Sequence, residues 1–233
     1  MSPVLRMECV SKSYGRTKAL DGISLELPQG QVVGLLGPNG SGKTTLLKIC
    51  AGLLQQDGGT VQICGGPVGA ASKAAVSYLP DRTYLSDGQR VREQLAFFRD
   101  FYQDFDAARA EAMLQQLGVD PAARFRTLSK GAREKVQLVL VMARRAKLYL
   151  LDEPIGGVDP AARDYILQTI TRNRDPESTV LISTHLIADV EPVLDGFLFL
   201  NQGRIVRSGY ADQVREAEGK SLDELFREVF RCF

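Results

Sequence analysis

Residues 37–44 read Gly37-Pro38-Asn39-Gly40-Ser41-Gly42-Lys43-Thr44 and fit the pattern G-x-x-x-x-G-K-[ST]. The apolar segment 32–36 before this stretch predicts a buried strand, and residues 45–54 after it predict a helix. Glycines at these positions let successive backbone N–H groups converge on phosphate oxygens at the helix N-terminus, where the helix dipole adds attraction. The stretch therefore predicts a phosphate-binding loop between a strand and a helix.

Two side chains of this loop have predicted chemical roles. Lys43 reaches the β- and γ-phosphates of a bound nucleotide, and the Thr44 hydroxyl ligates Mg²⁺. The sequence contains no Asn-Lys-x-Asp motif, which a guanine-reading GTPase would need. The loop residues expected to bind the nucleotide are Gly37, Pro38, Asn39, Gly40, Ser41, Gly42, Lys43, Thr44 and Thr45.

The segments around the loop predict two kinds of strand. Residues 5–10, 23–27 and 60–63 have the pattern of an antiparallel, half-exposed sheet. Residues 32–36 are apolar throughout, as expected of a parallel strand that is covered on both faces. Further short strands are expected at 75–79, 148–151 and 180–183, with a closing hairpin at 197–200 and 204–206.

From residue 91 to about residue 145 the pattern becomes helical. One apolar stripe repeats at helical spacing through Val91, Leu95, Phe98, Tyr102 and Phe105. Asp106 can cap the next helix, which ends at Gly118, and residues 136–143 predict a helix that is buried on all sides. Later in the chain, Asp159-Pro160 opens a helix and residues 221–230 predict an amphipathic one.

The expected fold class is α/β: a P-loop NTPase (RecA-like) core with an antiparallel β subdomain and an inserted α-helical subdomain. The chain is expected to form one domain over residues 1–233. Residues 1–85 and 146–233 would form the core with its antiparallel part, and residues 86–145 the helical subdomain.

Two acidic residues, Asp152 and Glu153, follow the predicted strand at 148–151. In P-loop proteins an Asp at the end of such a strand holds Mg²⁺, and a Glu after it can act as general base toward the attacking water. Taken alone, the same residues also fit an edge strand that ends in a solvated turn.

Further motifs follow in a set order: Leu128-Ser129-Lys130-Gly131, Asp152-Glu153-Pro154, Gly157-Val158-Asp159-Pro160 and Ser183-Thr184-His185. Together with the phosphate-binding loop, this order resembles the ATP-binding subunit of an ABC (ATP-binding cassette) transporter over nearly the whole chain. The segments Tyr78-Leu79-Pro80-Asp81-Arg82 and Leu128-Ser129-Lys130-Gly131 are similar to those of a bacterial exporter-type branch that is often accompanied by GntR-type regulators.

The resemblance implies a role for each matching residue. The catalytic residues would be Lys43, Glu153 and His185, the last sensing the γ-phosphate and ordering Glu153 and the attacking water. Tyr14 would stack on adenine, and Asp159 would lie across a dimer interface. Ser129 and Gly131 would contact the γ-phosphate of ATP on the opposite subunit, although Ser129 also fits a plain helix cap. The Mg²⁺ ligands would be Thr44, Asp81 and Asp152.

Two positions depart from the family pattern. Asp81 stands where the family usually has Gln, and a carboxylate there still ligates Mg²⁺ but adds negative charge near the γ-phosphate. In the segment that resembles the signature, Lys130 and Ala132 replace the more common Gly and Gln. Lys130 either favours the opposing ATP by its charge or is simply solvated.

The composition of the chain argues against a nucleic-acid partner and against a membrane-spanning segment. Lys and Arg number 29 against 28 Asp and Glu, so the net charge of +1 gives no bulk attraction to nucleic acid or anionic lipid. No apolar run is long enough to span a bilayer, and the start of the chain does not read as a secretory signal. The four cysteines are expected to be reduced thiols that mostly fill the core.

These features lead to one expected function and two alternatives. The expected protein is an ATPase that uses ATP and Mg²⁺, dimerises with itself or with a second ATP-binding subunit, and drives a separate transmembrane permease, with no nucleic-acid partner. It would be cytoplasmic and peripheral on the inner face of the plasma membrane. The alternatives are a soluble non-transport ABC ATPase and a weakly hydrolysing regulatory ATP switch.

Overall fold

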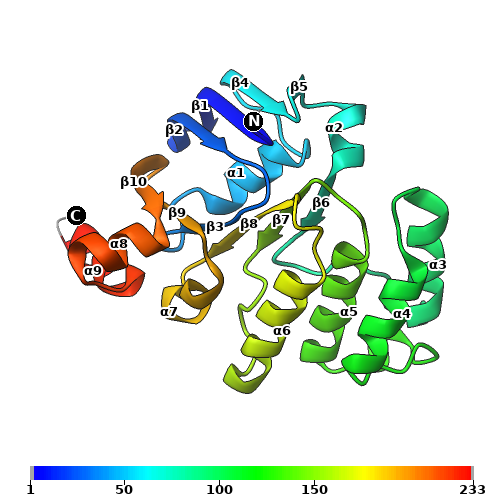
Figure 1. Ribbon diagram of the computed structural model, residues 1–233. Helices are drawn as coiled ribbons and strands as arrows, with labels where there is room; N and C mark the ends of the chain where they lie inside the picture. Colours follow the sequence, from blue (N-terminus) through cyan, green and yellow to red (C-terminus); the bar gives the residue numbers. More distant parts are fainter. Residues whose placement is uncertain (1–2, 232–233) are drawn as a thin grey trace.

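The structure is a computed structural model that describes residues 3–231, without the side chains of residues 161 and 162. It contains two β-sheets with helices between and around them (Figure 1). The elements are, in chain order, β1 (Leu5–Tyr14), β2 (Thr17–Leu27), β3 (Val32–Leu36), α1 (Lys43–Cys50), β4 (Gly58–Ile63), β5 (Gly66–Pro67), α2 (Ala70–Ala75), β6 (Val76–Leu79), α3 (Val91–Phe101), α4 (Ala107–Gln116), α5 (Lys130–Met142), β7 (Leu148–Asp152), α6 (Pro160–Arg172), β8 (Thr179–Thr184), α7 (Ile187–Val190), β9 (Gly196–Asn201), β10 (Arg204–Tyr210), α8 (Ala211–Glu218) and α9 (Leu222–Arg231), with short 3₁₀ turns at Phe125–Thr127 and Glu191–Val193.

The smaller sheet has the strand order β2-β1-β4-β5 and is antiparallel throughout. Its strands carry buried and exposed residues on opposite faces, because one face is covered by α1 and the other is open (Figure 1). The prediction of an antiparallel, half-exposed sheet is thus confirmed.

The larger sheet has the order β10-β9-β3-β8-β7-β6. From β9 to β6 all neighbours are parallel, and β10 is an antiparallel edge strand. Strands β3, β7 and β8 are wholly buried because α1 covers one face of the sheet and the helical layer with α5 and α6 covers the other (Figure 1). Successive side chains therefore enter two different cores, as Val33 and Leu35 do on one face and Val32 and Leu36 on the other.

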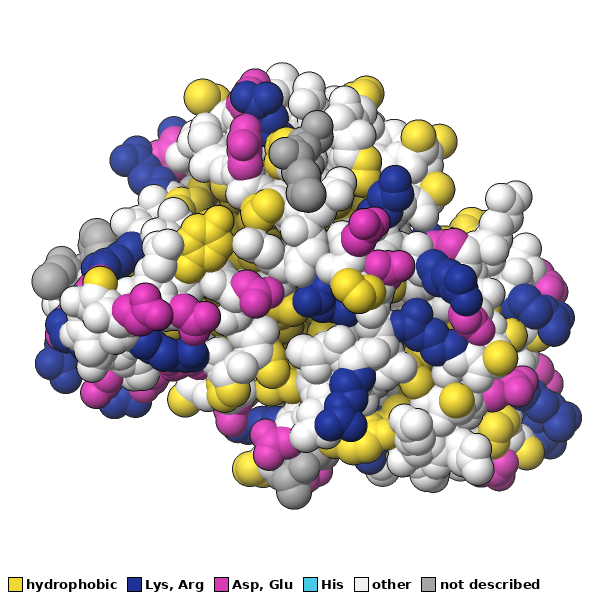
Figure 2. Space-filling model, in the orientation of Figure 1, with side chains coloured by type: hydrophobic (Ala, Val, Ile, Leu, Met, Phe, Trp, Pro, Cys, Tyr) yellow, Lys and Arg dark blue, Asp and Glu magenta, His cyan; other side chains and the backbone are white. Residues whose placement is uncertain are grey.

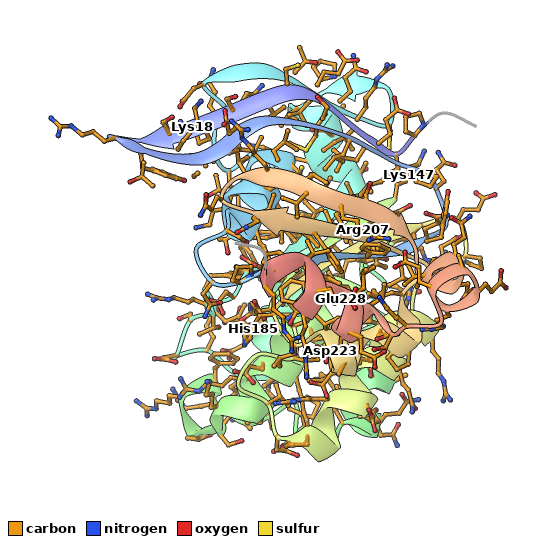
Figure 3. The ribbon with its side chains drawn as sticks, turned by 90° about the vertical axis from the view of Figure 1, so that its left-hand side faces the viewer. Lys18, Lys147, His185, Arg207, Asp223 and Glu228 are labelled. Atoms are coloured by element: carbon orange, nitrogen blue, oxygen red, sulfur yellow. The ribbon has the colours of Figure 1, made fainter. Side chains whose placement is uncertain are left out.

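Parallel strands bring their carboxyl ends to one edge of the sheet. Figure 3 shows this arrangement: Lys147, which precedes β7, lies on the opposite side of the molecule from His185, which follows β8. The loops after β3, β7 and β8 therefore meet at the same edge, and they carry the phosphate-binding loop, Glu153 and His185.

Several boundaries differ from the sequence prediction. Helix α1 ends at Cys50 and not at residue 54, because Gly52 adopts a left-handed conformation (φ 67°) that stops the helix. Helix α3 ends at Phe101, and Tyr102 is already extended. The aromatic stripe still forms a cluster, since the rings of Tyr102 and Phe105 lie 5.4 and 5.9 Å from that of Phe98.

The prediction for the cysteines was partly right: Cys9, Cys50 and Cys64 are free thiols, as expected, but most of them do not fill the core. Only Cys50 is buried, while Cys9 and Cys64 are exposed with left-handed backbones (φ 50° and 52°) at irregular points of the antiparallel sheet. Cys232 lies outside the described residues. The short helices α2, α7 and α8 were not predicted, because none is long enough to repeat an apolar stripe.

Within residues 3–231, no helix is long and apolar enough to cross a membrane.

Candidate functional site

The phosphate-binding loop joins the end of β3 to the start of α1. Gly42 has φ 110°, and a Cβ there would lie 2.4 Å from the Ala19 carbonyl oxygen, so only glycine fits. Gly37 is equally restricted, because its Cβ would lie 2.2 Å from the Leu200 carbonyl oxygen. Gly42 caps α1 without any side-chain hydrogen bond, which leaves the first N–H groups of the helix available to an anion.

Lys43, the first residue of α1, is folded back over this loop. Its ammonium donates to the carbonyl oxygens of Gly37 (2.7 Å) and Pro38 (3.1 Å) and lies 3.8 Å from Glu153 Oε1. Burial lowers the pKa of Lys43, while the carboxylates of Glu153 and Asp152 oppose that shift. The cation is therefore held at the loop by two hydrogen bonds to backbone carbonyls and by the nearby carboxylate.

Asp152 ends β7 and is only 1% exposed. Its Oδ1 accepts hydrogen bonds from the hydroxyls of Ser183 (2.5 Å) and Thr44 (3.2 Å), whereas Oδ2 is buried and has no hydrogen-bond partner within the described part of the chain. Burial raises the pKa of this carboxyl. A buried carboxylate oxygen without a partner, beside a threonine hydroxyl, is the hard oxygen environment that Mg²⁺ prefers, so these residues fit that ion.

Glu153 follows with a left-handed backbone (φ 49°), a conformation that costs energy for a residue with a side chain. Its carboxylate accepts hydrogen bonds from Thr184 Oγ1 to Oε2 (3.0 Å) and from His185 Nδ1 to Oε1 (3.1 Å). Gly156 lies close beneath, since a Cβ there would be 3.2 Å from Glu153 Cβ. The strained backbone and the two donors fix the direction of the carboxylate.

A cavity of about 670 Å³ lies over these groups and collects most of the predicted site residues. Tyr14, at the end of β1 and 51% exposed, forms its far wall. The predicted residues that line the cavity are Tyr14, Asn39, Gly40, Gly42, Lys43, Thr44, Thr45, Asp81, Glu153 and His185. Gly37, Pro38 and Asp152 bound the site through the hydrogen bonds described above, and Ser41 is buried in the loop with an unpartnered hydroxyl.

Three predicted residues lie elsewhere on this chain. Ser129, Gly131 and Asp159 line a separate cavity of about 440 Å³. Ser129 caps α5, since its Oγ accepts a hydrogen bond from the Ala132 N–H (3.2 Å). Within one chain, the structure does not bring these residues to the phosphate-binding loop, although Lys130 beside them lines the larger cavity.

Sequence reasoning gave no role to two hydroxyl residues at the end of β8. Ser183 donates to Asp152, and Thr184 donates to Glu153, so each orients one of the two carboxylates. Their place directly before His185, at the carboxyl end of a buried strand, was the available signal.

Comparison with known proteins agrees with this geometry. A family model described as "ABC transporter" matches residues 20–156. Nod factor export ATP-binding protein I of Paraburkholderia xenovorans (strain LB400) is 30% identical over 95% of this chain and 76% of its own length. Linearmycin resistance ATP-binding protein LnrL of Bacillus subtilis (strain 168) is 29% identical over 88% of this chain and 69% of its own.

Solved structures have the same fold. A structure described as the ATP-binding subunit of an ABC transporter superposes with a TM-score of 0.86 at 28% identity, covering 97% of this chain and 99% of the other. The family model spans the phosphate-binding loop and the two carboxylates that the structure brings together. The chain is therefore an ATP-binding domain of the ABC transporter family.

Proposed function

We propose that the chain binds and hydrolyses MgATP as one of two ATP-binding subunits of a transporter, and that it drives a separate membrane permease. Membership of the family implies ATP hydrolysis. One observation carries the proposal for this chain: the Glu153 carboxylate is held in place beside the phosphate-binding loop. It accepts hydrogen bonds from His185 Nδ1 (3.1 Å) and Thr184 Oγ1 (3.0 Å).

Each residue at the phosphate-binding loop has a part in this reaction. Lys43 and the free N–H groups at the start of α1 bind the β- and γ-phosphates and stabilise charge on the transferring phosphoryl group. Glu153 orients the attacking water and accepts its proton, and His185 keeps the carboxylate in position. Thr44 and Asp152, with Asp81 facing them, would hold Mg²⁺, which neutralises phosphate charge when bound.

A complete site on this proposal needs two chains. Ser129, Gly131 and Asp159 lie together in their own cavity, away from the phosphate-binding loop of the same chain. A second subunit arranged head to tail would bring its Ser129 and Gly131 to this loop, where the capped N-terminus of α5 adds a second anion-binding helix end. The partner is either a second copy or a related ATP-binding subunit.

The permease is proposed to dock in a groove between α2 and α3, which we call the α2–α3 groove. It has a volume of about 1070 Å³, and its outer residues are Lys48, Leu53, Lys73, Arg82, Tyr84 and Phe101. The groove includes Arg82 and Tyr84 from the segment after β6. Export is the proposed direction of transport, because one of the relatives named above is described as an export protein and the other as a resistance protein. Docking there would keep the chain on the cytoplasmic face of the membrane.

The substitution Glu153→Gln tests the hydrolytic part of the proposal. It keeps the size and hydrogen-bond acceptor of the side chain but removes the base, so ATPase activity should fall at least ~100-fold. ATP should then hold the variant as a dimer in light scattering after gel filtration. Glu177→Gln, at an exposed turn before β8, is the matched control and should leave both properties unchanged.

A Glu153→Gln variant that remains monomeric with MgATP would contradict the two-subunit site and favour a regulatory ATP switch. Co-purification of the wild-type chain with a multi-span membrane protein from solubilised membranes tests the permease separately. A chain that never associates with membranes would favour a soluble ABC ATPase.

A further inference from the structure

The charges of the α2–α3 groove point to the chemistry of the segment that fills it. Four cations line the groove. Arg144 is buried, and the other three, Lys48, Lys73 and Arg82, are exposed. Among residues 3–231, none of the three forms an ion pair or a side-chain hydrogen bond. This contrasts with much of the charged surface, where Asp21, Asp57 and many other acids are paired.

Among the residues that the structure describes, no free acid lines the groove to balance these cations. Its one acidic lining residue is Asp104, and both carboxylate oxygens of Asp104 are bound by Arg144, at 3.0 and 3.1 Å. Arg144 is in turn only 3% exposed and lies over the Tyr102 ring at 3.9 Å. The wall of the groove is therefore neutral, and the net charge of the groove comes from the three free cations.

The helix dipole partly explains why the two lysines occupy their positions, but it does not explain the position of Arg82. Lys48 and Lys73 lie in the last turns of α1 and α2, where a cation is favourable at the negative end of the helix dipole. Arg82 lies in the loop after β6 and caps no helix. Helix dipoles thus do not account for three cations around a single groove.

Apolar surface lies between the cations. Leu53, Tyr84 and Phe101 are 63%, 52% and 67% exposed, and all three line the groove. Phe97, one helical turn before Phe101, is 56% exposed and stacks on it with ring centroids 5.9 Å apart. On the face drawn in Figure 2, hydrophobic, basic and acidic side chains are interspersed where the α2 and α3 regions meet. Exposed aromatic side chains of this kind mark a protein interface more often than a solvated surface.

We infer that the occupant of the α2–α3 groove is an amphipathic segment of the permease whose apolar and aromatic side chains are flanked by Asp or Glu. The apolar side chains cover Leu53, Tyr84 and Phe101, and the carboxylates pair with Lys48, Lys73 and Arg82. Pairs at the edge of such an interface set the register and favour acidic over basic partners. This inference rests on the proposed permease function.

The test uses two labelled peptides that differ only in charge. Both are 16-residue amphipathic helices with Leu and Phe on one face, and their polar positions carry either three Glu or three Lys. Fluorescence anisotropy with the full chain measures each dissociation constant. We expect the Glu peptide to bind at least ~10-fold more tightly in low salt, and the difference to shrink as salt screens the charges.

The double variant Lys48→Glu/Lys73→Glu should abolish or reverse this preference. Arg231→Glu, which reverses an exposed cation on α9 at the other side of the molecule, is the matched control and should keep the preference (Figure 1). Melting curves by circular dichroism verify that all variants fold.

Equal affinity of the wild-type chain for the two peptides, or a preference that survives in the double variant, would overturn the inference. If a permease co-purifies with the wild-type chain while the peptides show no preference, the charge assignment fails and the proposed function stands. If no permease associates, the proposed function itself fails.

Discussion

The phosphate-binding edge and the α2–α3 groove are both proposed to bind anionic groups, but they are built in different ways. At the edge, backbone N–H groups from one continuous loop and a single buried cation, Lys43, face the ligand. In the groove, exposed side chains are brought together from segments between residues 48 and 144. A small, rigid phosphate is recognised by a short piece of backbone, whereas a polypeptide partner is recognised by a wide surface that no single segment can provide.

The largest expected effect is a loss of ATPase activity when the phosphate-binding edge is changed. Lys43→Ala removes the buried cation from the phosphate-binding loop, so we expect ATPase activity to fall ~10²- to 10³-fold, the usual cost of losing one preorganised charge-stabilising group. A coupled assay of phosphate release measures the loss. Lys147→Ala, at the opposite edge of the sheet, is the control (Figure 3). If Lys43→Ala retained wild-type activity, the edge would not be the catalytic region.

The second largest effect is a loss of protein stability when Arg144, in the wall of the α2–α3 groove, is changed. Arg144 donates to the carbonyls of Val76 (2.6 Å) and Ala74 (2.7 Å) as well as to Asp104, so it joins β6 and α2 to the segment after α3. Arg144→Ala leaves these buried acceptors unpaired and should lower the free energy of unfolding by ~3–5 kcal/mol. Urea unfolding, followed by circular dichroism, measures the change.

The neighbouring arginine provides a matched control for this prediction. Arg145 is exposed and pairs with Asp106 at 2.9 Å, so Arg145→Ala should cost at most ~1 kcal/mol. Equal losses for the two variants would show that the wall of the groove does not depend on the buried guanidinium.

The smallest effect is a shift in Mg²⁺ dependence when Asp81, which lies between the two regions, is changed. Asp81 lines the cavity over the phosphate-binding loop, and Arg82 beside it lines the groove. Asp81→Asn weakens a ligand that is one of several, so the half-saturating Mg²⁺ concentration should rise ~10-fold with folding unchanged. ATPase rates over a Mg²⁺ titration measure this shift, and Asp212→Asn on α8 is the control. An unchanged Mg²⁺ dependence and an unchanged coupled ATPase rate would remove Asp81 from the metal site.

Residues 37–44 were enough to predict the strand–loop–helix unit, because their glycines allow backbone conformations such as the φ of 110° that Gly42 adopts at the start of α1. The parallel core was also predictable, since β3 is apolar throughout and β7 and β8 contain short apolar runs that must be covered on both faces. Boundaries were less predictable: α3 ends at Phe101, while its apolar stripe continues into an extended segment, because ring packing does not require a helix.

Tertiary structure alone decided how the site residues are held and where the second surface lies. The sequence placed Asp152 and Glu153 at the end of a strand, but the donors that orient them, Ser183 and Thr184, come from a strand about thirty residues later in the chain and only meet them through parallel pairing. The α2–α3 groove has no motif at all, because Lys48, Lys73 and Arg82 become neighbours only when α1, α2 and the loop after β6 pack together. A backbone geometry is encoded locally and can be read from adjacent residues, whereas a surface of side chains depends on packing between distant segments.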